Sequence, residues 1–350
     1  MNWLIIWYLA LALAAISLGM MATEICLRLY WRKKEIRRDK RKKALTEWIT
    51  TYIFSPLSGD TRALIQTNED IWIIAELAED FFRSLKGNVI EKLGHLLENQ
   101  HYYQQHLTAL WRTREIHKRM LSLQTLSHYS GFEDEDLFRL MISPREHPSL
   151  QLRAMRRLAE RHILYLPPVL YCLKRMKSVS WIRAADVLRH FDPICADDMI
   201  PIALNREESL TFRLAVIHAL QEMHDVRDMD RLLILLDDPN DTIREHLLLA
   251  VRSTGIKISN EWLQKALTDA SIKVRRVAVR LAEHHATPAL FETLYRSLED
   301  PDWSVGYHAA HALFNTNMAG RRLLEMAIRK DVGRAADIAR DVMLEMQSKQ

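Results

Sequence analysis

Two hydrophobic patterns divide the chain. Trp3 to Ala22 is a run of twenty consecutive uncharged positions in which apolar residues face every side of a helix. Beyond about residue 60, apolar residues recur at spacings of three and four, which is typical of amphipathic helices with one buried face. Gly and Pro are scarce, at 9 and 10 residues. Alternating runs of β-branched residues are nearly absent, so the sequence predicts an all-α protein.

The uncharged run is long enough to cross a bilayer. At 1.5 Å per residue a helix of this length spans about 30 Å, the thickness of the hydrocarbon core. No basic residue precedes it, which argues against a cleaved signal peptide. We therefore expect residues 1–27 to be a single transmembrane helix. Aromatic residues near its two ends are the expected interfacial anchors, namely Trp3, Trp7, Tyr8, Tyr30 and Trp31.

Charge is concentrated directly after this run. Ten Lys or Arg residues and two acids lie between positions 28 and 43, a local balance of +8. The whole chain carries +4, so the rest carries −4, too acidic for a broad nucleic-acid surface. The positive-inside rule places the C-terminal side in the cytoplasm of a bacterium, N-out and C-in at the inner membrane. The topogenic and lipid-facing residues of this juxtamembrane helix, residues 28–55, are Arg28, Arg32, Lys33, Lys34, Arg37, Arg38, Lys40, Arg41, Lys42 and Lys43.

A regular internal period organises the C-terminal part of the chain. Asp238, Asp269 and Asp300 recur at one constant interval, and a β-branched residue follows each of them five positions later. An arginine one position further on recurs in the same register, with earlier copies at nearly the same interval. The last two units depart from this pattern, since Gly306 and Asp337 occupy the arginine position. Such periodicity predicts stacked structural repeats.

Each unit has the pattern of a helical hairpin. The leucines before Asp238 end a first helix, and Pro239 breaks it because the residue before proline avoids the α region. Asp241 or Thr242 is the expected cap of the second helix. One hairpin cannot bury its apolar face, so neighbouring hairpins must stack into a solenoid. We expect this solenoid over residues 141–350 and irregular, degenerate repeats over 56–140.

These residues resemble HEAT repeats of the short bacterial type also found in phycobilisome-lyase-like proteins. The resemblance covers about residues 140 to 346, and more weakly 60 to 130. It implies a polar ladder in which turn aspartates and the arginines after them stack along the solenoid. The matching residues are Arg153, Arg183, Arg213, Arg244, Arg275, Asp238, Asp269 and Asp300. We interpret the arginines as structural, because their spacing is regular.

No chemistry-bearing motif stands out. There is no Gly-rich phosphate loop and no hydrolase, metalloprotease or kinase signature. Cys26, Cys172 and Cys195 lack metal-ligand spacing. His308 and His311 share one helix, but a metal site needs three or four converging ligands. The His-Glu dipeptides of HEAT-like di-iron hydroxylases are also missing. We therefore predict no catalytic residues, no cofactor and no metal.

The favoured hypothesis is a membrane-anchored cytoplasmic scaffold or adaptor that binds one or more partner proteins. An integral membrane enzyme is one expected partner, and the chain would then be an accessory subunit of a glycosyltransferase or an exopolysaccharide synthesis and export complex. A lyase-type enzyme is the main alternative, and it would need a concave pocket with convergent titratable groups. A nucleic-acid binder is a weaker one, whose binding would fall steeply with salt.

Overall fold

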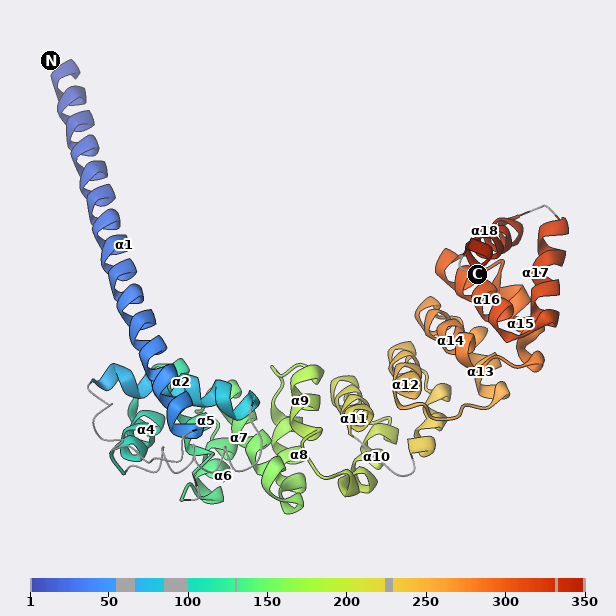
Figure 1. Cartoon of the computed structure of the whole chain (residues 1–350), viewed down its shortest axis with the longest axis horizontal. Coiled ribbons are helices and arrows are strands. Elements are labelled where there is room, and N and C mark those ends of the chain that lie inside the picture. Colours follow the sequence, from blue (N-terminus) through green and yellow to red (C-terminus); the bar gives the residue numbers. More distant parts are fainter. Residues whose placement is uncertain are drawn as a thin grey trace. The chain divides into compact units, whose positions relative to one another are not determined.

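The computed structural model describes residues 2–54, 67–84, 100–129, 131–223, 229–330 and 333–348. These residues form helices joined by turns, without a strand among them (Figure 1). The all-helical part of the prediction therefore agrees with the structure. The chain divides into two compact units, Met1–Glu133 and Asp134–Gln350. The domain limits expected from the sequence, near residues 27, 55 and 140, stay predictions.

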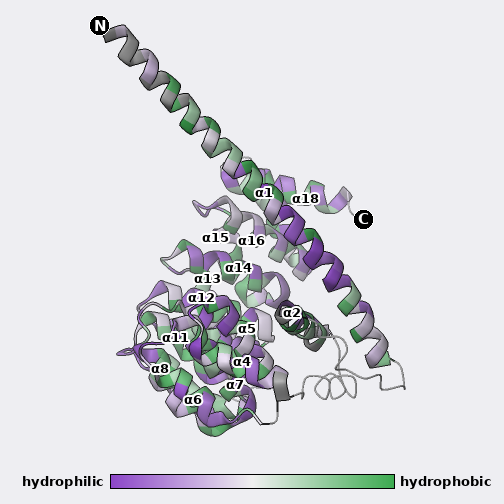
Figure 2. Cartoon of the chain, turned by 90° about the vertical axis from the view of Figure 1, so that its left-hand side faces the viewer, coloured by the Kyte–Doolittle hydropathy of each residue, from purple (hydrophilic) through white to green (hydrophobic). Residues whose placement is uncertain are grey.

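The first unit contains four described helices: α1 (Asn2–Phe54), α2 (Asn68–Ser84), α4 (Gln100–Arg112) and α5 (Ile116–Leu126). The C-terminal part of α1 packs on α2, and Leu45 and Ile49 of α1 are fully buried. Helix α5 packs against both α2 and α4. Figure 2 shows the basic cluster of α1 as a strongly hydrophilic stretch between more apolar ones. The apolar face that begins near Leu45 therefore packs this long helix against the unit.

The predicted transmembrane anchor is wrong. Among the residues that the structure describes, no helix offers a stretch that is both long and apolar enough to cross a membrane. The first charged residue of α1 is Glu24, which forms an exposed ion pair of 2.5 Å with Arg28 one turn later. The helix then continues without a break through the basic cluster to Phe54. This finding overturns the single-pass topology, the N-out and C-in orientation and the inner-membrane localisation expected above.

The second unit is a stack of helical hairpins. Its longer helices are α6 (Asp134–Ile142), α7 (Pro148–Arg161), α8 (Leu166–Arg175), α9 (Trp181–Leu188), α10 (Ala196–Leu204), α11 (Leu210–Glu222), α12 (Asp241–Thr254), α13 (Asn260–Leu267), α14 (Ile272–His285), α15 (Phe291–Ser297), α16 (Trp303–Thr316), α17 (Met318–Lys330) and α18 (Arg334–Ser348). Shorter 3₁₀ segments accompany them in the described part of this unit: η2 (Ile163–Tyr165), η3 (Pro193–Cys195), η4 (Met229–Asp237) and η5 (Pro288–Leu290).

Consecutive hairpins stack through their second helices. Helix α7 packs on α9, α9 on α11, and α11 on α12; α12, α14, α16 and α18 follow in the same way. The first helices make fewer contacts with one another, as between α13 and α15. The periodic pattern explains this arrangement, because Ile243, Val274 and Val305 occupy equivalent places and are each at most 1% exposed. The repeats therefore share one continuous apolar core, as expected of a helical solenoid.

Two local expectations differ from the structure. The leucines before Asp238 lie in η4, a 3₁₀ helix, instead of an α-helix, and Asp238 N–H continues its pattern by bonding to the Leu235 carbonyl three residues back at 3.0 Å. The cap of α12 is Asn240, whose side-chain oxygen accepts from Thr242 N–H at 2.9 Å. It displaces the expected Asp241 and Thr242 because the chain remains extended at Asn240 and turns helical directly after it.

Candidate functional site

Three arginines join consecutive repeats by ion pairs with the aspartate of the next turn. Arg244 binds Asp269 with two parallel bonds of 2.8 Å, and Arg275 binds Asp300 at 2.7 and 3.1 Å. Arg213 donates to Asp238 at 2.5 Å, and both side chains are at most 5% exposed. The two bidentate pairs, those of Arg244 and Arg275, combine charge with fixed geometry. The two partners of every pair belong to different hairpins, so each pair bridges two repeats.

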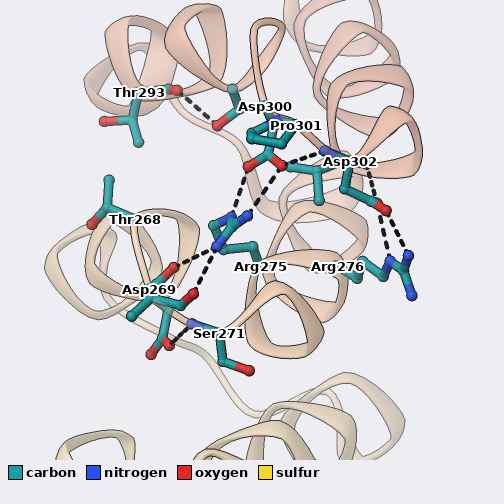
Figure 3. Close-up of polar contacts among 12 residues, drawn as sticks. Thr268, Asp269, Ser271, Arg275, Arg276, Thr293, Asp300, Pro301 and Asp302 are labelled. Atoms are coloured by element: carbon teal, nitrogen blue, oxygen red, sulfur yellow. Dashed lines mark hydrogen bonds and ion pairs between the residues drawn. The ribbon is translucent and has the colours of Figure 1, made fainter.

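The same arginines also close the turn that precedes their own helix. Arg244 Nη1 donates to the carbonyls of Asp238 and Pro239, at 2.7 and 3.2 Å. Arg275 Nη1 repeats this with Asp269 and Ala270, at 2.9 and 3.1 Å (Figure 3). One planar guanidinium thus satisfies carbonyls of one turn and the carboxylate of the next. The hydrogen bonds to these carboxylates raise the pKa of both arginines above the ordinary value.

Each ladder aspartate also fixes its own turn. Asp238 accepts from Asn240 N–H at 2.9 Å, Asp269 from Ser271 N–H and Asp300 from Asp302 N–H, both at 2.8 Å. These Asx turns end the first helix and aim the chain into the second. In the repeat that contains α16, Asp302 then caps that helix by accepting from Val305 N–H at 3.2 Å. The aspartate at the ladder position therefore has two roles: its carboxylate forms the turn and also binds the arginine of the preceding repeat.

The ladder is incomplete at its N-terminal end. Arg183 is exposed at the start of α9, and no carboxylate of the described residues pairs with it. The acid at the corresponding place in the next turn, Glu208, is bound by Lys174 of α8 instead. Arg153 is half-buried in α7 and has the uncharged Ser178 at that place. The structure thus brings together three of the five expected arginines with the three expected aspartates.

At the C-terminal end the ladder is closed by an arginine outside the repeat pattern. Arg334, the first residue of α18, donates to the carbonyls of Asp300 and Pro301 at 2.9 and 2.5 Å. Gly306 stands at the periodic arginine position because α18 packs there: a Cβ atom would lie 2.7 Å from Ile338 Cδ1. The period could not reveal Arg334. Its only sequence signal is an arginine that opens a helix directly after Gly333, whose φ is +87°.

The expected anchor and lipid-facing residues lie on α1. The five aromatic side chains are at least 59% exposed. Arg41 makes a bidentate pair with the buried Asp70 of α2 at 2.8 and 3.1 Å, which raises the pKa of Arg41. Arg38 and Lys42 reach Glu76 of the same helix. Three members of the basic cluster thus attach α1 to α2. Arg28 pairs with Glu24, and the remaining members are exposed and make no ion pair with a described carboxylate.

The outward side chains of α7, α9, α11, α12, α14, α16 and α18 form what we call the second-helix face. Contacts between successive helices define it. Arg156 of α7 lies 3.7 Å from Asp186 of α9, and Arg189, at the end of α9, binds Glu222 of α11 at 2.7 Å. Trp181 of α9 packs against His218 of α11, with ring centroids 5.2 Å apart. These polar and aromatic groups alternate along neighbouring helices.

Titratable side chains gather on this face at α16. Tyr307 donates to Glu345 of α18 at 2.6 Å, and this hydrogen bond is the main cause that raises the pKa of Tyr307 to about 12. His308 Nδ1 lies 2.5 Å from Glu283 of α14, and His308 Nε2 accepts from Arg280 at 3.3 Å. Donation at Nδ1 and acceptance at Nε2 fit a neutral imidazole. The cluster holds α14, α16 and α18 together.

A family model of HEAT repeats matches residues 260–340. This stretch runs from α13 into α18 and contains the ladder pair of Arg275 and Asp300. This part of the chain is thus similar to HEAT repeats. The match names HEAT repeats in general and does not distinguish the phycobilisome-lyase-like type. No curated protein matches the chain.

Outside the ladder, the HEAT repeats hold a pocket of about 350 Å³ between α15, α17 and α18. Its described lining is Tyr295, Arg296, Glu299, Ala327, Lys330 and Ala335, which includes no Ser, Cys or His nucleophile. Lys330 Nζ lies over the Tyr295 ring, 5.2 Å from its centroid. Across the described residues, no three His, Cys, Asp or Glu side chains come together as metal ligands. The polar contacts found in the described residues are therefore mainly contacts between helices.

Proposed function

We propose that the protein is a non-catalytic scaffold that binds a partner protein along the second-helix face of its HEAT repeats. One observation carries this proposal: the charged groups in the turns of the regular hairpins bind one another and the turn carbonyls. Arg244 and Arg275 each direct their donors to one carboxylate and two carbonyls. The exposed side chains of the second helices differ from repeat to repeat. A solenoid of this kind offers an extended surface for recognition.

The turn residues support a structural role for the ladder. Asp269 and Asp300 are at most 11% exposed at their side chains, and the arginines that bind them at most 15%. Groups so enclosed and so fully paired have no free donor or acceptor to offer a substrate. A lyase-type active site would instead need converging titratable groups in an accessible pocket. We therefore assign Arg213, Arg244, Arg275 and Arg334 to the integrity of the stack.

A purification from the source organism tests the proposal and identifies the partner. The full chain, carrying a C-terminal affinity tag, is expressed in its source organism, cross-linked lightly and purified under mild conditions. The scaffold proposal expects one or a few proteins to be recovered reproducibly, with cross-links concentrated on lysines and acids of the second helices. Subunits of a glycosyltransferase or exopolysaccharide complex are the partners hypothesised from the sequence, and this purification would identify or replace them. Recovery of the chain alone under every condition would contradict the scaffold function.

A further inference from the structure

Cations of the second-helix face are paired with acids along one part of the face and are partly unpaired along another. On α7, α9 and α11 cations meet acids: Arg156 reaches Glu160 and Asp186, while Arg189 reaches Asp186 and Glu222. Helices α7 and α14 each have four Lys or Arg residues and one acid. On α7 three of these cations are paired, Arg156 and Arg157 with Glu160 and Arg161 with Asp134. The one acid of α14 is Glu283. That acid is engaged by His308. Two cations of α14, Lys273 and Arg280, are therefore left without an ion pair to a described carboxylate.

Three of the α14 cations point to solvent along one side of the helix. Lys273, Arg276 and Arg280 are spaced three and four residues apart and are exposed, whereas Arg275 belongs to the ladder. Arg276 pairs with Asp302 but keeps 47% of its side chain exposed. No carboxylate of the described residues forms an ion pair with Lys273 or Arg280. The pKa of Asp241 is lowered mainly by the hydrogen bond from Ser271 and further by the nearby charge of Lys273.

His308 holds one of these cations in place. Arg280 Nε donates to His308 Nε2 at 3.3 Å, while Glu283 binds the opposite ring nitrogen. This contact positions the guanidinium without neutralising it, since an imidazole nitrogen carries no negative charge. A preorganised, unneutralised guanidinium is well suited to bind an incoming carboxylate, because less side-chain freedom is lost on binding.

An exposed aromatic pair lies beside the cations. Trp303, at the start of α16, is 55% exposed and stacks on Tyr307 with ring centroids 4.7 Å apart. Arg276 binds Asp302, the residue directly before Trp303, so the cationic row and the aromatic pair meet at the beginning of α16. Trp, Tyr and Arg are the side chains most enriched among residues that dominate protein interfaces. The patch formed by Lys273, Arg276, Arg280, Trp303 and Tyr307 is called the α14–α16 patch below.

We propose that the α14–α16 patch binds an acidic segment of the partner protein, with Asp or Glu side chains on the cations and an apolar side chain on Trp303. The proposal rests on the scaffold function proposed above and names the chemistry of its partner. A nucleic acid fits less well, because tight binding requires many phosphate contacts. Here three cations are flanked by Glu283, Asp302 and Glu345. An acidic peptide needs only a few carboxylates in register with the arginines.

The test uses the full chain and two probes. The first is an array of synthetic peptides in which Asp and Glu alternate with Leu or Phe, beside an array in which Lys replaces the acids. The second is the partner recovered from the source organism. The proposal expects binding to the acidic array that weakens with added salt. The double variant Lys273→Glu with Arg280→Glu should weaken it about tenfold or more, and Trp303→Ala should weaken it without changing its dependence on salt.

A matched control separates the patch from overall charge. The variant Lys257→Glu with Arg322→Glu makes the same charge change at two exposed sites outside the patch, and it should bind like the wild type. Helical circular dichroism and melting confirm that both variants are folded. Equal loss in both variants, no binding to the acidic array, or tighter binding to single-stranded DNA overturns the proposal. If the patch variant keeps the natural partner, this inference fails while the scaffold function stands; if the wild type recovers no partner, the scaffold function itself fails.

Discussion

At the scale of single residues, the ladder arginines have two roles at once. Arg244 satisfies two carbonyls of its own turn and the carboxylate of Asp269 in the next repeat, with 14% of its side chain exposed. Removing a charged donor from such a site leaves a buried carboxylate without its partner. The cost exceeds that of an exposed ion pair, which is about 0–1 kcal/mol.

We expect Arg244→Ala to lower the free energy of unfolding by about 2–3 kcal/mol. Arg244→Lys should recover only part of this, since an ammonium cannot form the bidentate pair. Urea denaturation followed by circular dichroism measures both. Arg252→Ala, an exposed residue at the end of the same helix, is the control and should change stability by a few tenths of a kcal/mol at most, roughly the size of a helix-dipole effect. Equal losses for Arg244→Ala and Arg252→Ala would contradict the structural assignment.

A buried histidine in the first unit predicts a pH dependence. His106 of α4 is fully buried between Trp72 and Tyr102, and Ser122 faces its Nδ1 at 3.2 Å. Burial lowers the pKa of His106 to about 4. The unfolded chain, with a histidine pKa of about 6.5, binds the proton more readily. Stability from this residue is therefore complete above pH 6.5 and is lost as the pH falls toward 4.

The expected loss over that interval is about 3 kcal/mol. His106→Gln should flatten the dependence of the urea midpoint on pH between 6.5 and 4, whatever its effect at neutral pH. His117→Gln, on the exposed side of α5, leaves the buried ring in place and should retain the wild-type dependence. An unchanged slope in His106→Gln would show that other groups control acid unfolding.

The residue scale also shows what sequence could predict. Asp238, Asp269 and Asp300 were identified because their spacing is constant, and the structure places each against an arginine of the preceding repeat. The roles of Asn240 and Arg334 were not predicted. The cap position depends on which residue keeps an extended backbone, and the sequence does not show that at Asn240. Arg334 lies outside the periodic positions and contacts the carbonyls of Asp300 and Pro301. Periodicity finds contacts that repeat. It is silent on contacts that occur once.

At the scale of elements, close approach of two helices depends on a missing side chain. Asn317 begins α17 by accepting from Ala319 N–H at 2.9 Å and Gly320 N–H at 3.2 Å. A Cβ atom on Gly320 would lie 2.1 Å from the backbone oxygen of Leu313 in α16. Backbone cannot move aside as a flexible side chain can. The corner between α16 and α17 therefore requires glycine for space, not for an unusual φ.

We expect Gly320→Ala to destabilise the last hairpin by about 1–3 kcal/mol, the usual cost of overpacking. Hydrogen exchange should show faster opening of α17 and α18 and little change in α12. Gly19→Ala is the counterpart in α1, where a Cβ atom meets nothing within 4 Å. It should stabilise the helix by about 0.5–1 kcal/mol, because alanine is the better helix former. A neutral Gly320→Ala would mean that the two helices do not cross so closely.

Helix α1 shows where element prediction failed. Length and apolar composition predicted a membrane span, but those criteria were applied to the first part of a helix that continues to Phe54. Its second half belongs to the packed unit: Arg41 is bound to Asp70 and Leu45 and Ile49 are buried. A hydropathy window does not register which later turns of the same helix pack against a neighbour. The second helices, by contrast, were predictable because every one buries the same face.

At the scale of the whole molecule, the two compact units predict separable folding. The ladder contacts, the apolar core of the stack and the α16 cluster all lie within Asp134–Gln350. We expect this segment, expressed alone, to be helical and to unfold with the same urea midpoint as the corresponding transition of the full chain. Arg244→Ala should lower both midpoints equally. A fragment without helical circular dichroism would show that the first unit is needed for the second to fold.

The sequence separation between the arginine and the aspartate of a ladder pair affects how repeats can be gained or lost. Arg244 and Asp269 are separated by less than one period, so duplicating a whole period between Arg213 and Asp300 would keep each guanidinium of that stretch facing a carboxylate. Length can thus change by recombination between repeats without creating an orphaned charge. The C-terminal end lacks this freedom, since Asp300 and Pro301 are closed by Arg334 and α18 lies over Gly306. We therefore expect duplication to be tolerated in the middle of the array and to be disruptive at its last hairpin.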